Sequence, residues 1–316
     1  MIDAPVLVIT AVDDITADLV IRRLYDRAVP VVRLDPADFL GGVATMSARF
    51  GREMSGVIRT TSRELDLGRV RAVWWRRPTP YQVPAGLDEH ISRFTVNEAG
   101  MGFTGVLAAL DSLWVYHPWD IRAADHKPVQ LNAAVDCGFR IPETLITNDL
   151  QQAHVFVQAF ESVVYKPLRQ GPLPSEDGRL GTIWVGPVSA DDLNEAVADT
   201  AHTFQARVPK VADVRVTVVD QRIFAVRIDS GGLLDWRSDY SALDYSLVPC
   251  PVEVERAIHS YMTRFRLLFG AFDFALTLSG EWIFLECNPN GQWAWIEKQE
   301  DAVADALADL LAKGKG

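Results

Sequence analysis

The stretch Phe272–Trp295, FDFALTLSGEWIFLECNPNGQWAW, decides how the rest of this chain is interpreted. It contains two runs of strand-forming residues that flank Ser279 and Gly280, a pair typical of a tight turn. A two-residue turn at this point would pair Leu278 with Glu281 across an antiparallel hairpin. The pattern therefore predicts two adjacent strands at the centre of a sheet.

Two acidic side chains meet in this predicted hairpin. Counting back from a two-residue turn, Asp273 lies directly opposite Glu286, with Cβ atoms about 5 Å apart. Asn288 follows two residues later and shares the same face of the strand. Two carboxylates at that distance repel each other unless a cation neutralises them, and oxygen ligands suit a hard cation such as Mg²⁺. The hairpin is thus predicted to be a metal site, the alternative being a solvated strand face with incidental acids.

The composition of the whole chain narrows the classes of function. Its 316 residues are enough for two or three subdomains, and its formal charge of −11 argues against non-specific nucleic-acid binding. No apolar run is long enough for a transmembrane helix, and the first residues lack the pattern of a signal peptide. Three cysteines without C-x-x-C spacing are expected to be reduced thiols. These features predict a cytoplasmic protein without a membrane or nucleic-acid partner.

The N-terminal part predicts an open α/β domain. Apolar runs at 5–10 and 31–34 flank a segment of helical periodicity, which is the pattern of a β-α-β unit. No G-x-G-x-x-G follows the first run, so a dinucleotide is not indicated. A later strand at 70–75 runs into Arg76 and Arg77, which either hold a carboxylate or phosphate or cover the strand end in solvent.

Two lysines lie at positions that are unfavourable for a cation unless an anion is bound beside them. Lys127 lies in the first turn of a predicted helix, where a cation opposes the helix dipole. Lys166 interrupts the apolar strand SVVYKP at 162–167. A bound phosphate would account for both, and an exposed helix lysine and an edge-strand lysine are the alternatives. The segment 169–181 that follows is rich in glycine and turn formers, as are loops that cover phosphates.

A second predicted hairpin carries two arginines within apolar strands. Arg215 and Arg227 lie in the runs 214–219 and 223–228, which flank Asp220-Gln221-Arg222. They face each other if the turn has three residues and lie on opposite faces if it has two. Arginines in such strands indicate an anionic partner.

In chain order, these features resemble the ATP-grasp superfamily. The similarity is strongest in FLECNPNGQW, VVYKP and DVRVTVV…FAVRI, and it covers the chain from about Asp120 to its end. WWRRP at 74–78, the DVRVTVV strand and the ECNPNGQW ending resemble most the ligases that modify ribosomally made peptides, the microviridin-type or graspetide macrocyclases. The resemblance implies an α/β (α+β) ATP-grasp fold. It comprises an N-terminal pre-ATP-grasp domain at 1–118, a central subdomain at 119–202 and a C-terminal antiparallel-sheet subdomain with the metal site at 203–316.

The resemblance also implies roles for individual residues. Arg215 and Arg227 would lie near the γ-phosphate and the acyl group, with Arg227 stabilising the developing oxyanion. Ala206 departs from the family pattern, in which an acidic residue often follows the glutamine. The residues implied to contact ATP are Lys127, Lys166, Gln205, Ala206 and Val208. Those implied to bind Mg²⁺, or Mn²⁺ in its place, are Asp273, Glu286 and Asn288. Those implied to contact the substrate are Arg76, Arg77 and Lys210.

The implied activity is that of an ATP-dependent carboxylate–amine or carboxylate–alcohol ligase. It would activate Asp or Glu side chains of a precursor peptide as acyl phosphates and join them to Ser or Thr hydroxyls or Lys amines, giving ω-ester or ω-amide rings. The implied partner is a precursor peptide with an N-terminal leader, and a homodimer is the assembly that the resemblance suggests. The alternatives are an amino-acid or glutamate ligase of the glutathione-synthetase-like or ribosomal-protein-modifying type, and a peptide-binding module with a degenerate nucleotide site.

Overall fold

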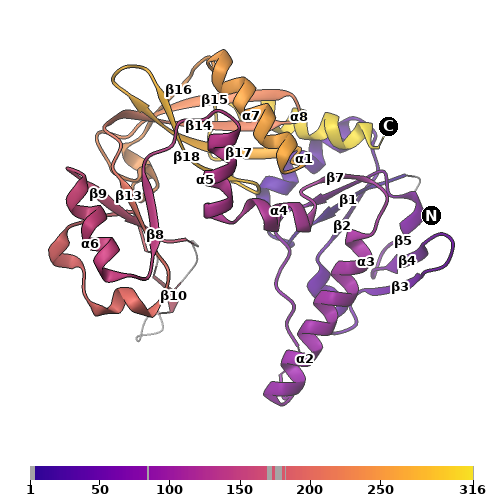
Figure 1. The fold of residues 1–316 in the computed structure, drawn as a ribbon. Helices are drawn as coiled ribbons and strands as arrows, with labels where there is room; N and C mark the ends of the chain where they lie inside the picture. The colour runs from indigo at the N-terminus through magenta and orange to yellow at the C-terminus, as the bar shows by residue number, and fades with distance from the viewer. Residues whose placement is uncertain (1–3, 84, 169–172, 175–179, 182, 316) are drawn as a thin grey trace.

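The computed structural model describes residues 4–83, 85–168, 173–174, 180–181 and 183–315. Its strands form two four-stranded sheets, one five-stranded sheet and two smaller sheets (Figure 1). No helix among these residues is long and apolar enough to cross a membrane. The mixed α/β architecture agrees with the predicted fold class, including an antiparallel sheet in the C-terminal region.

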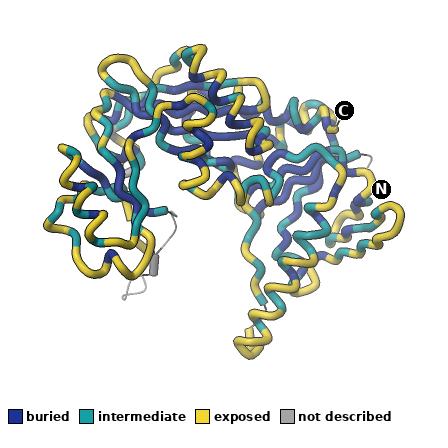
Figure 2. Tube along the Cα trace, viewed as in Figure 1, coloured by how far each residue is buried: buried dark blue, intermediate teal, exposed yellow. Residues whose placement is uncertain are grey.

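The N-terminal domain is built on a parallel sheet of order β2-β1-β6-β7. Its strands are apolar because both faces are covered, which is usual for parallel sheets. A small antiparallel sheet and a projecting helix complete the domain, and Figure 2 shows that the end of that helix is largely exposed. The elements are β1 (Val6–Ile9), α1 (Ile15–Asp26), β2 (Val31–Leu34), β3 (Thr45–Arg49), β4 (Ser55–Arg59), β5 (Glu64–Asp66), β6 (Ala72–Trp75), α2 (Glu89–Ala99), a π-helical turn (Gly100–Thr104), α3 (Gly105–Ala108) and β7 (Leu113–Val115).

The central sheet is antiparallel between its paired strands and has the order β12-β9-β13-β8. One helix packs on it through Ala153 and Val157. The elements are β8 (Thr144–Thr147), α6 (Leu150–Ala159), β9 (Val163–Lys166), β12 (Gly186–Val188) and β13 (His202–Ala206), with the short pair β10 (Leu173–Pro174) and β11 (Leu180–Gly181) beside them. Strand β13 crosses the boundary predicted between residues 202 and 203, so this sheet extends to Ala206.

The C-terminal sheet is antiparallel, with the order β16-β15-β14-β17-β18. One of its faces packs against helices α5 and α7 through an aromatic cluster around Phe139, Tyr261 and Phe272. The elements are α4 (Pro118–Ala124), α5 (Lys127–Asp136), β14 (Lys210–Val219), β15 (Arg222–Asp229), β16 (Asp244–Leu247), α7 (Val252–Arg264), β17 (Phe269–Thr277), β18 (Trp282–Asn288) and α8 (Glu300–Lys313). Helix α5 therefore packs with the C-terminal sheet, although it lies within the segment predicted as the central subdomain.

The last helix, α8, returns to the N-terminal domain and packs along α1. Its apolar side, which includes Val303, Leu307 and Leu311, joins the core beneath β1 and β6. Ion pairs line the outer edge, where Arg27 bonds Asp309 at 2.8 Å. The C-terminal helix thus fixes the N-terminal domain against the sheet that carries the predicted metal residues.

The β17–β18 hairpin reaches its predicted register by an unexpected route. The two-residue turn is wrong, because Leu276 pairs with Trp282 and the backbone N–H of Thr277 bonds the carbonyl of Glu281, which leaves a three-residue loop. That loop shifts the register by one residue, and a β-bulge before Glu286 shifts it back. Asp273 consequently lies opposite Glu286, as predicted.

The β14–β15 hairpin has a two-residue turn, since Val219 pairs with Arg222. Arg215 therefore pairs with Val226, and Arg227 pairs with Val214. Because neighbouring residues of a strand point to opposite faces, the two arginines lie on opposite sides of the sheet. The structure thus selects one of the two arrangements that the sequence left open.

Candidate functional site

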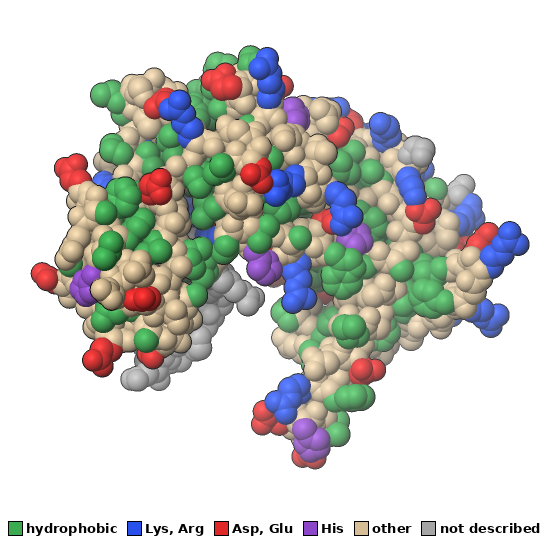
Figure 3. All heavy atoms as spheres, in the orientation of Figure 1, with side chains coloured by type: hydrophobic (Ala, Val, Ile, Leu, Met, Phe, Trp, Pro, Cys, Tyr) green, Lys and Arg blue, Asp and Glu red, His purple; other side chains and the backbone are tan. Residues whose placement is uncertain are grey.

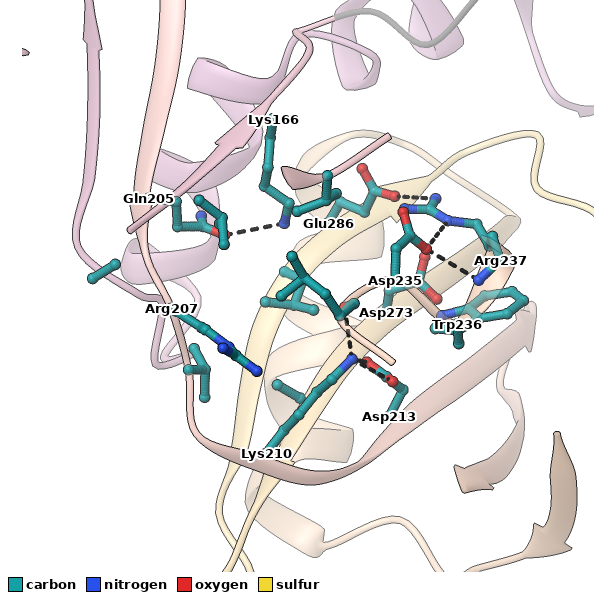
Figure 4. Close-up of a pocket in the computed structure, with 17 residues that line it drawn as sticks. Lys166, Gln205, Arg207, Lys210, Asp213, Asp235, Trp236, Arg237, Asp273 and Glu286 are labelled. Carbon is teal, nitrogen blue, oxygen red and sulfur yellow. Dashed lines mark hydrogen bonds and ion pairs between the residues drawn. The ribbon is translucent and has the colours of Figure 1, made fainter. Parts of the chain in front are cut away.

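The first cavity lies between the central sheet and the C-terminal sheet (Figure 4). Its empty volume, counted with the space open to solvent, is about 590 Å³. Strands β9 and β13 form one wall, β14, β17 and β18 form the other, and the loop 234–237 contributes to the lining. Gln205, Ala206 and Val208, all predicted to contact a nucleotide, line it where the chain passes from one sheet to the other.

Lys166 points into this cavity from β9 (Figure 4). Its ammonium donates a 3.0 Å hydrogen bond to Oε1 of Gln205, whose Nε2 donates in turn to Oγ1 of Thr144 at 2.9 Å. Burial lowers the pKa of Lys166 to about 8, because the charged form loses solvation there. The side chain of Gln205 therefore holds the half-buried Lys166 ammonium at the cavity wall.

Glu286 is the charged centre of the site. Its Oε2 accepts a 2.6 Å hydrogen bond from Lys127, and its Oε1 accepts one of 3.0 Å from Arg237. Burial alone would raise the pKa of Glu286, but Lys127, Arg237 and Lys166 hold it well below its usual range. The carboxylate is consequently ionised and surrounded by three cations.

Arg215, Asp273 and Glu286 form a row across three neighbouring strands. Arg215 donates to both carboxylate oxygens of Asp273 at 2.8 Å, and its other terminal nitrogen donates to the carbonyl of Gln292 at 3.0 Å. These side chains are almost fully buried. A Cβ on Gly291 would lie 2.8 Å from Nη2 of Arg215, so the absence of a side chain at this position lets the loop after β18 approach the row.

The predicted metal residues converge, and their chemistry fits a hard cation. Nδ2 of Asn288 lies 3.4 Å from Asp273 and 3.5 Å from Glu286, so two carboxylates and an amide share one face. Among the described residues, no three His, Cys, Asp or Glu side chains form such a group by themselves. The carboxylates now contact protein cations, which would have to turn toward another anion when a metal ion is bound.

Arg76 is an internal residue, which corrects its prediction as a substrate contact. It is 1% exposed, and it donates to Oδ1 of Asn290 at 3.1 Å and to Oε1 of Gln292 at 2.5 Å. Asp14 lies 3.4 Å from its Nε. Arg76 therefore holds the loop after β18 against the N-terminal domain. Arg77 is exposed and does not line the cavity between the central and C-terminal sheets.

Arg227 lies away from the cavity, which corrects the catalytic role predicted for it. It points to the sheet face covered by α7 and pairs with Asp229, two residues further along the same strand, at 2.6 Å. Strand alternation puts Arg215 on the cavity face and Arg227 on the other.

Lys210 lines the first cavity from the start of β14. Its ammonium bonds both oxygens of Asp213 and the carbonyl of Leu234. Burial raises the pKa of Asp213 to about 6, against the lowering effect of Lys210. Lys210 thus lines the cavity between the two sheets, whereas it was predicted as a substrate contact. Most of the predicted phosphate-covering loop, 169–181, lies outside the described residues.

A second, larger cavity adjoins the first at Glu286. Its empty volume is about 1580 Å³, and it is lined by the α4–α5 junction, including Arg122, His126 and Lys127, and by Asn288. In Figure 3 the molecule is hollowed between the central-sheet lobe and the N-terminal part, with basic and histidine side chains above the hollow over α4 and α5. Glu286 is the residue that both linings share.

Comparisons with known proteins agree with this fold. Residues 5–122 match the family model described as the MvdD pre-ATP grasp domain. No curated protein matches the chain. The macrocyclase MdnC from Microcystis aeruginosa MRC, solved with its precursor peptide MdnA, is 28% identical, with 98% of this chain and 99% of that chain covered and a TM-score of 0.87.

The chain has the ATP-grasp fold. A Chryseobacterium gregarium RiPP-associated ATP-grasp ligase, solved with ADP and with a leader and core peptide, superposes with a TM-score of 0.90 at 24% identity, over 99% of this chain and 97% of that chain. The ATP-grasp ligase PsnB, solved with a minimal precursor, Mg and ADP, gives 0.75 at 21% identity, over 98% of each chain. The resemblance to ribosomal-peptide ATP-grasp macrocyclases predicted from the sequence is confirmed.

The candidate site contains residues that the sequence did not single out. Arg237 contacts Glu286 and Asp235 from a short 3₁₀ turn, Trp236–Ser238, and its guanidinium lies 5.7 Å from the ring centroid of Trp236. Burial opposes the charge of Arg237, but Glu286 and Asp235 raise its pKa. This turn belongs to an irregular loop without periodicity, so no pattern identified it. The run of aspartate, tryptophan and arginine was the one available signal.

Proposed function

We propose that this chain is an ATP-dependent ligase that joins acidic side chains of a ribosomal precursor peptide to hydroxyl or amine side chains. The observation that carries the proposal is the meeting of two cavities at Glu286. The first contains Lys166, a half-buried cation that a nucleotide phosphate would pair with. The second is larger, which leaves room for a peptide segment.

The nucleotide would lie with its base beside Ala206 and Val208 and its phosphates toward Lys166, Lys127 and Arg237. A bound phosphate chain would offer these cations a new partner, and Asp273, Glu286 and Asn288 would then hold Mg²⁺. When bound, Mg²⁺ would neutralise charge on the phosphate oxygens. These roles are proposed from the cavity lining and from the oxygen donor set.

The chemistry needs no nucleophile from the protein. A peptide carboxylate oxygen attacks the γ-phosphorus of ATP, the bond to ADP breaks, and an acyl phosphate forms. A hydroxyl or amine of the same peptide then attacks the carbonyl carbon. The nucleophile loses its proton, and phosphate leaves with one oxygen of the original carboxylate. Arg215, which lies on the cavity face, and Arg237 are the arginines that we propose to stabilise the charge.

The test is incubation of the protein with ATP, Mg²⁺ and a precursor peptide containing Thr or Ser and Asp or Glu repeats, followed by mass spectrometry. Each crosslink should remove the mass of one water from the peptide and release one ADP. ATP turnover that responds to free amino acids and leaves peptides unchanged would support an amino-acid or glutamate ligase instead. Failure to bind MgATP would favour a peptide-binding module.

Nucleotide binding should depend on pH through Lys166. Its pKa of about 8 lies below the ordinary value of 10.5, so the free protein loses this charge as the pH rises through 8. Phosphates favour the charged form, and binding above pH 8 should therefore take up a proton. In the unfolded chain, Lys166 would have its ordinary pKa of 10.5 and would hold its proton more tightly than in the folded protein. The lowered pKa therefore disfavours folding below pH 8, and the free energy of unfolding should increase as the pH rises from 8 to 10.5.

Calorimetry in buffers of different ionisation heat measures this proton uptake. We expect the dissociation constant for ADP to rise above pH 8, by up to about tenfold for each pH unit. Lys166→Arg keeps a charge at the position and should remove the pH dependence. An affinity for ADP that does not change between pH 7 and pH 10 in the unsubstituted protein would contradict a phosphate role for Lys166.

A further inference from the structure

We propose that Arg122 binds a carboxylate of the acidic peptide in the second cavity and thereby selects acidic over amide side chains. The inference rests on the proposed function, because it assigns the peptide to the cavity that meets the nucleotide cavity at Glu286. It concerns a specificity-determining residue at the end of α4.

The position of the second cavity gives the direction from which the acyl substrate arrives. Lys166 and Asp273 line the first cavity, Lys127 and Asn288 line the second, and Glu286 lines both. A carboxylate that attacks the γ-phosphorus must approach in line with the departing ADP. On the far side of Glu286 from the first cavity lies the second cavity, so the acyl substrate would arrive through it.

The charges around the second cavity explain why an additional cation is needed there. Lys127 is already bonded to Glu286 at 2.6 Å, so within the protein its charge is largely compensated. Asp125 lines the same cavity, makes an interaction of its own and adds a negative charge. A carboxylate entering beside Asp125 and a triphosphate would be repelled without a further positive group.

Arg122 is that group. Its side chain is exposed and lines the cavity, and within the described ranges its guanidinium makes no hydrogen bond or ion pair. The backbone carbonyl of Arg122 is bonded by Nδ1 of His126 at 2.7 Å, which fixes the α4–α5 junction that presents the side chain. A guanidinium can bind a carboxylate through two parallel hydrogen bonds, which an amide side chain does not match.

The experiment compares two blocked probe peptides, Thr-Glu-Thr-Glu and Thr-Gln-Thr-Gln, binding to the full chain in the presence of MgADP. The unsubstituted protein should bind the glutamate peptide about tenfold more tightly. Arg122→Ala should abolish the preference, and Arg122→Glu should reverse it. Arg256→Ala, which removes an exposed arginine from α7, is the matched control and should leave the preference unchanged.

The affinity for MgADP separates this inference from the proposed function. It should be the same in all three variants as in the unsubstituted protein, because Arg122 does not line the first cavity. Protein that binds MgADP but shows no preference for the glutamate peptide, or a preference that survives Arg122→Ala, would overturn the role of Arg122. Protein that does not bind MgADP at all would overturn the proposed function instead.

Discussion

Glu286→Gln should lower the rate of ATP-dependent peptide crosslinking by about 100- to 1000-fold, the range typical for loss of one electrostatic contact at a reaction centre. The glutamine keeps the shape of the side chain but leaves Lys127 and Arg237 without their shared carboxylate. It also removes one of the two carboxylates proposed to hold Mg²⁺. The measurement is the initial rate of crosslinked product at saturating ATP, with Mg²⁺ varied.

Glu281→Gln is the matched control for this substitution. Glu281 lies on the same hairpin, just before β18, where it is exposed and pairs with Arg140. Its replacement makes the same chemical change outside the site and should alter the rate less than twofold, as expected for an exposed pair. Crosslinking by Glu286→Gln within tenfold of the unsubstituted rate would show that Glu286 is not the centre of the site.

Gly291→Ala should reduce both activity and stability. A Cβ at this position would lie 2.5 Å from the Cβ of Ala271, 2.8 Å from Nη2 of Arg215 and 3.1 Å from the Cβ of Asn288. Because Ala271 belongs to buried strand β17, the loop after β18 would have to move away and would disturb Arg215 and Asn288 together. Overpacking of this kind costs about 1–3 kcal/mol in the free energy of unfolding.

Denaturant titration measures the stability change, and the crosslinking rate measures the displacement of the site. We expect the rate to fall by about tenfold or more even under conditions in which the variant is folded, since small misplacements of catalytic groups are costly. Gly186→Ala, at a glycine with nothing within 4 Å of an added Cβ, is the control. Unchanged activity in Gly291→Ala would mean that this loop does not position Arg215.

Local sequence patterns were sufficient to place Asp273 opposite Glu286 on two neighbouring strands. Asp273 and Glu286 could be paired by counting, although the count succeeded because a bulge compensated for a longer loop. Neither the loop length nor the bulge leaves a clear signal in FDFALTLSGEWIFLEC. The predicted pairing was therefore correct, although the two-residue turn from which it was counted is wrong.

Residues whose place depends on tertiary packing were assigned less well. Arg227 was chosen because an arginine in an apolar strand suggests an anion, but the two-residue turn directs it to the opposite face. Arg76 was predicted as a substrate contact because it follows an apolar strand. Its partners are Asn290 and Gln292, which are more than two hundred positions away in the chain. Arg237 lies in an irregular loop and bonds Glu286, which is 49 positions away in the chain. Such long-range pairings cannot be read from local patterns.

The central claim is that a peptide carboxylate is phosphorylated by ATP at the meeting point of the two cavities. It is tested most directly with a precursor peptide whose Asp and Glu side-chain carboxylates carry the heavy oxygen isotope. If an acyl phosphate forms, each crosslink should transfer one labelled oxygen from the peptide to inorganic phosphate, as seen by mass spectrometry of the phosphate. Crosslinked peptide accompanied by unlabelled phosphate would contradict the account.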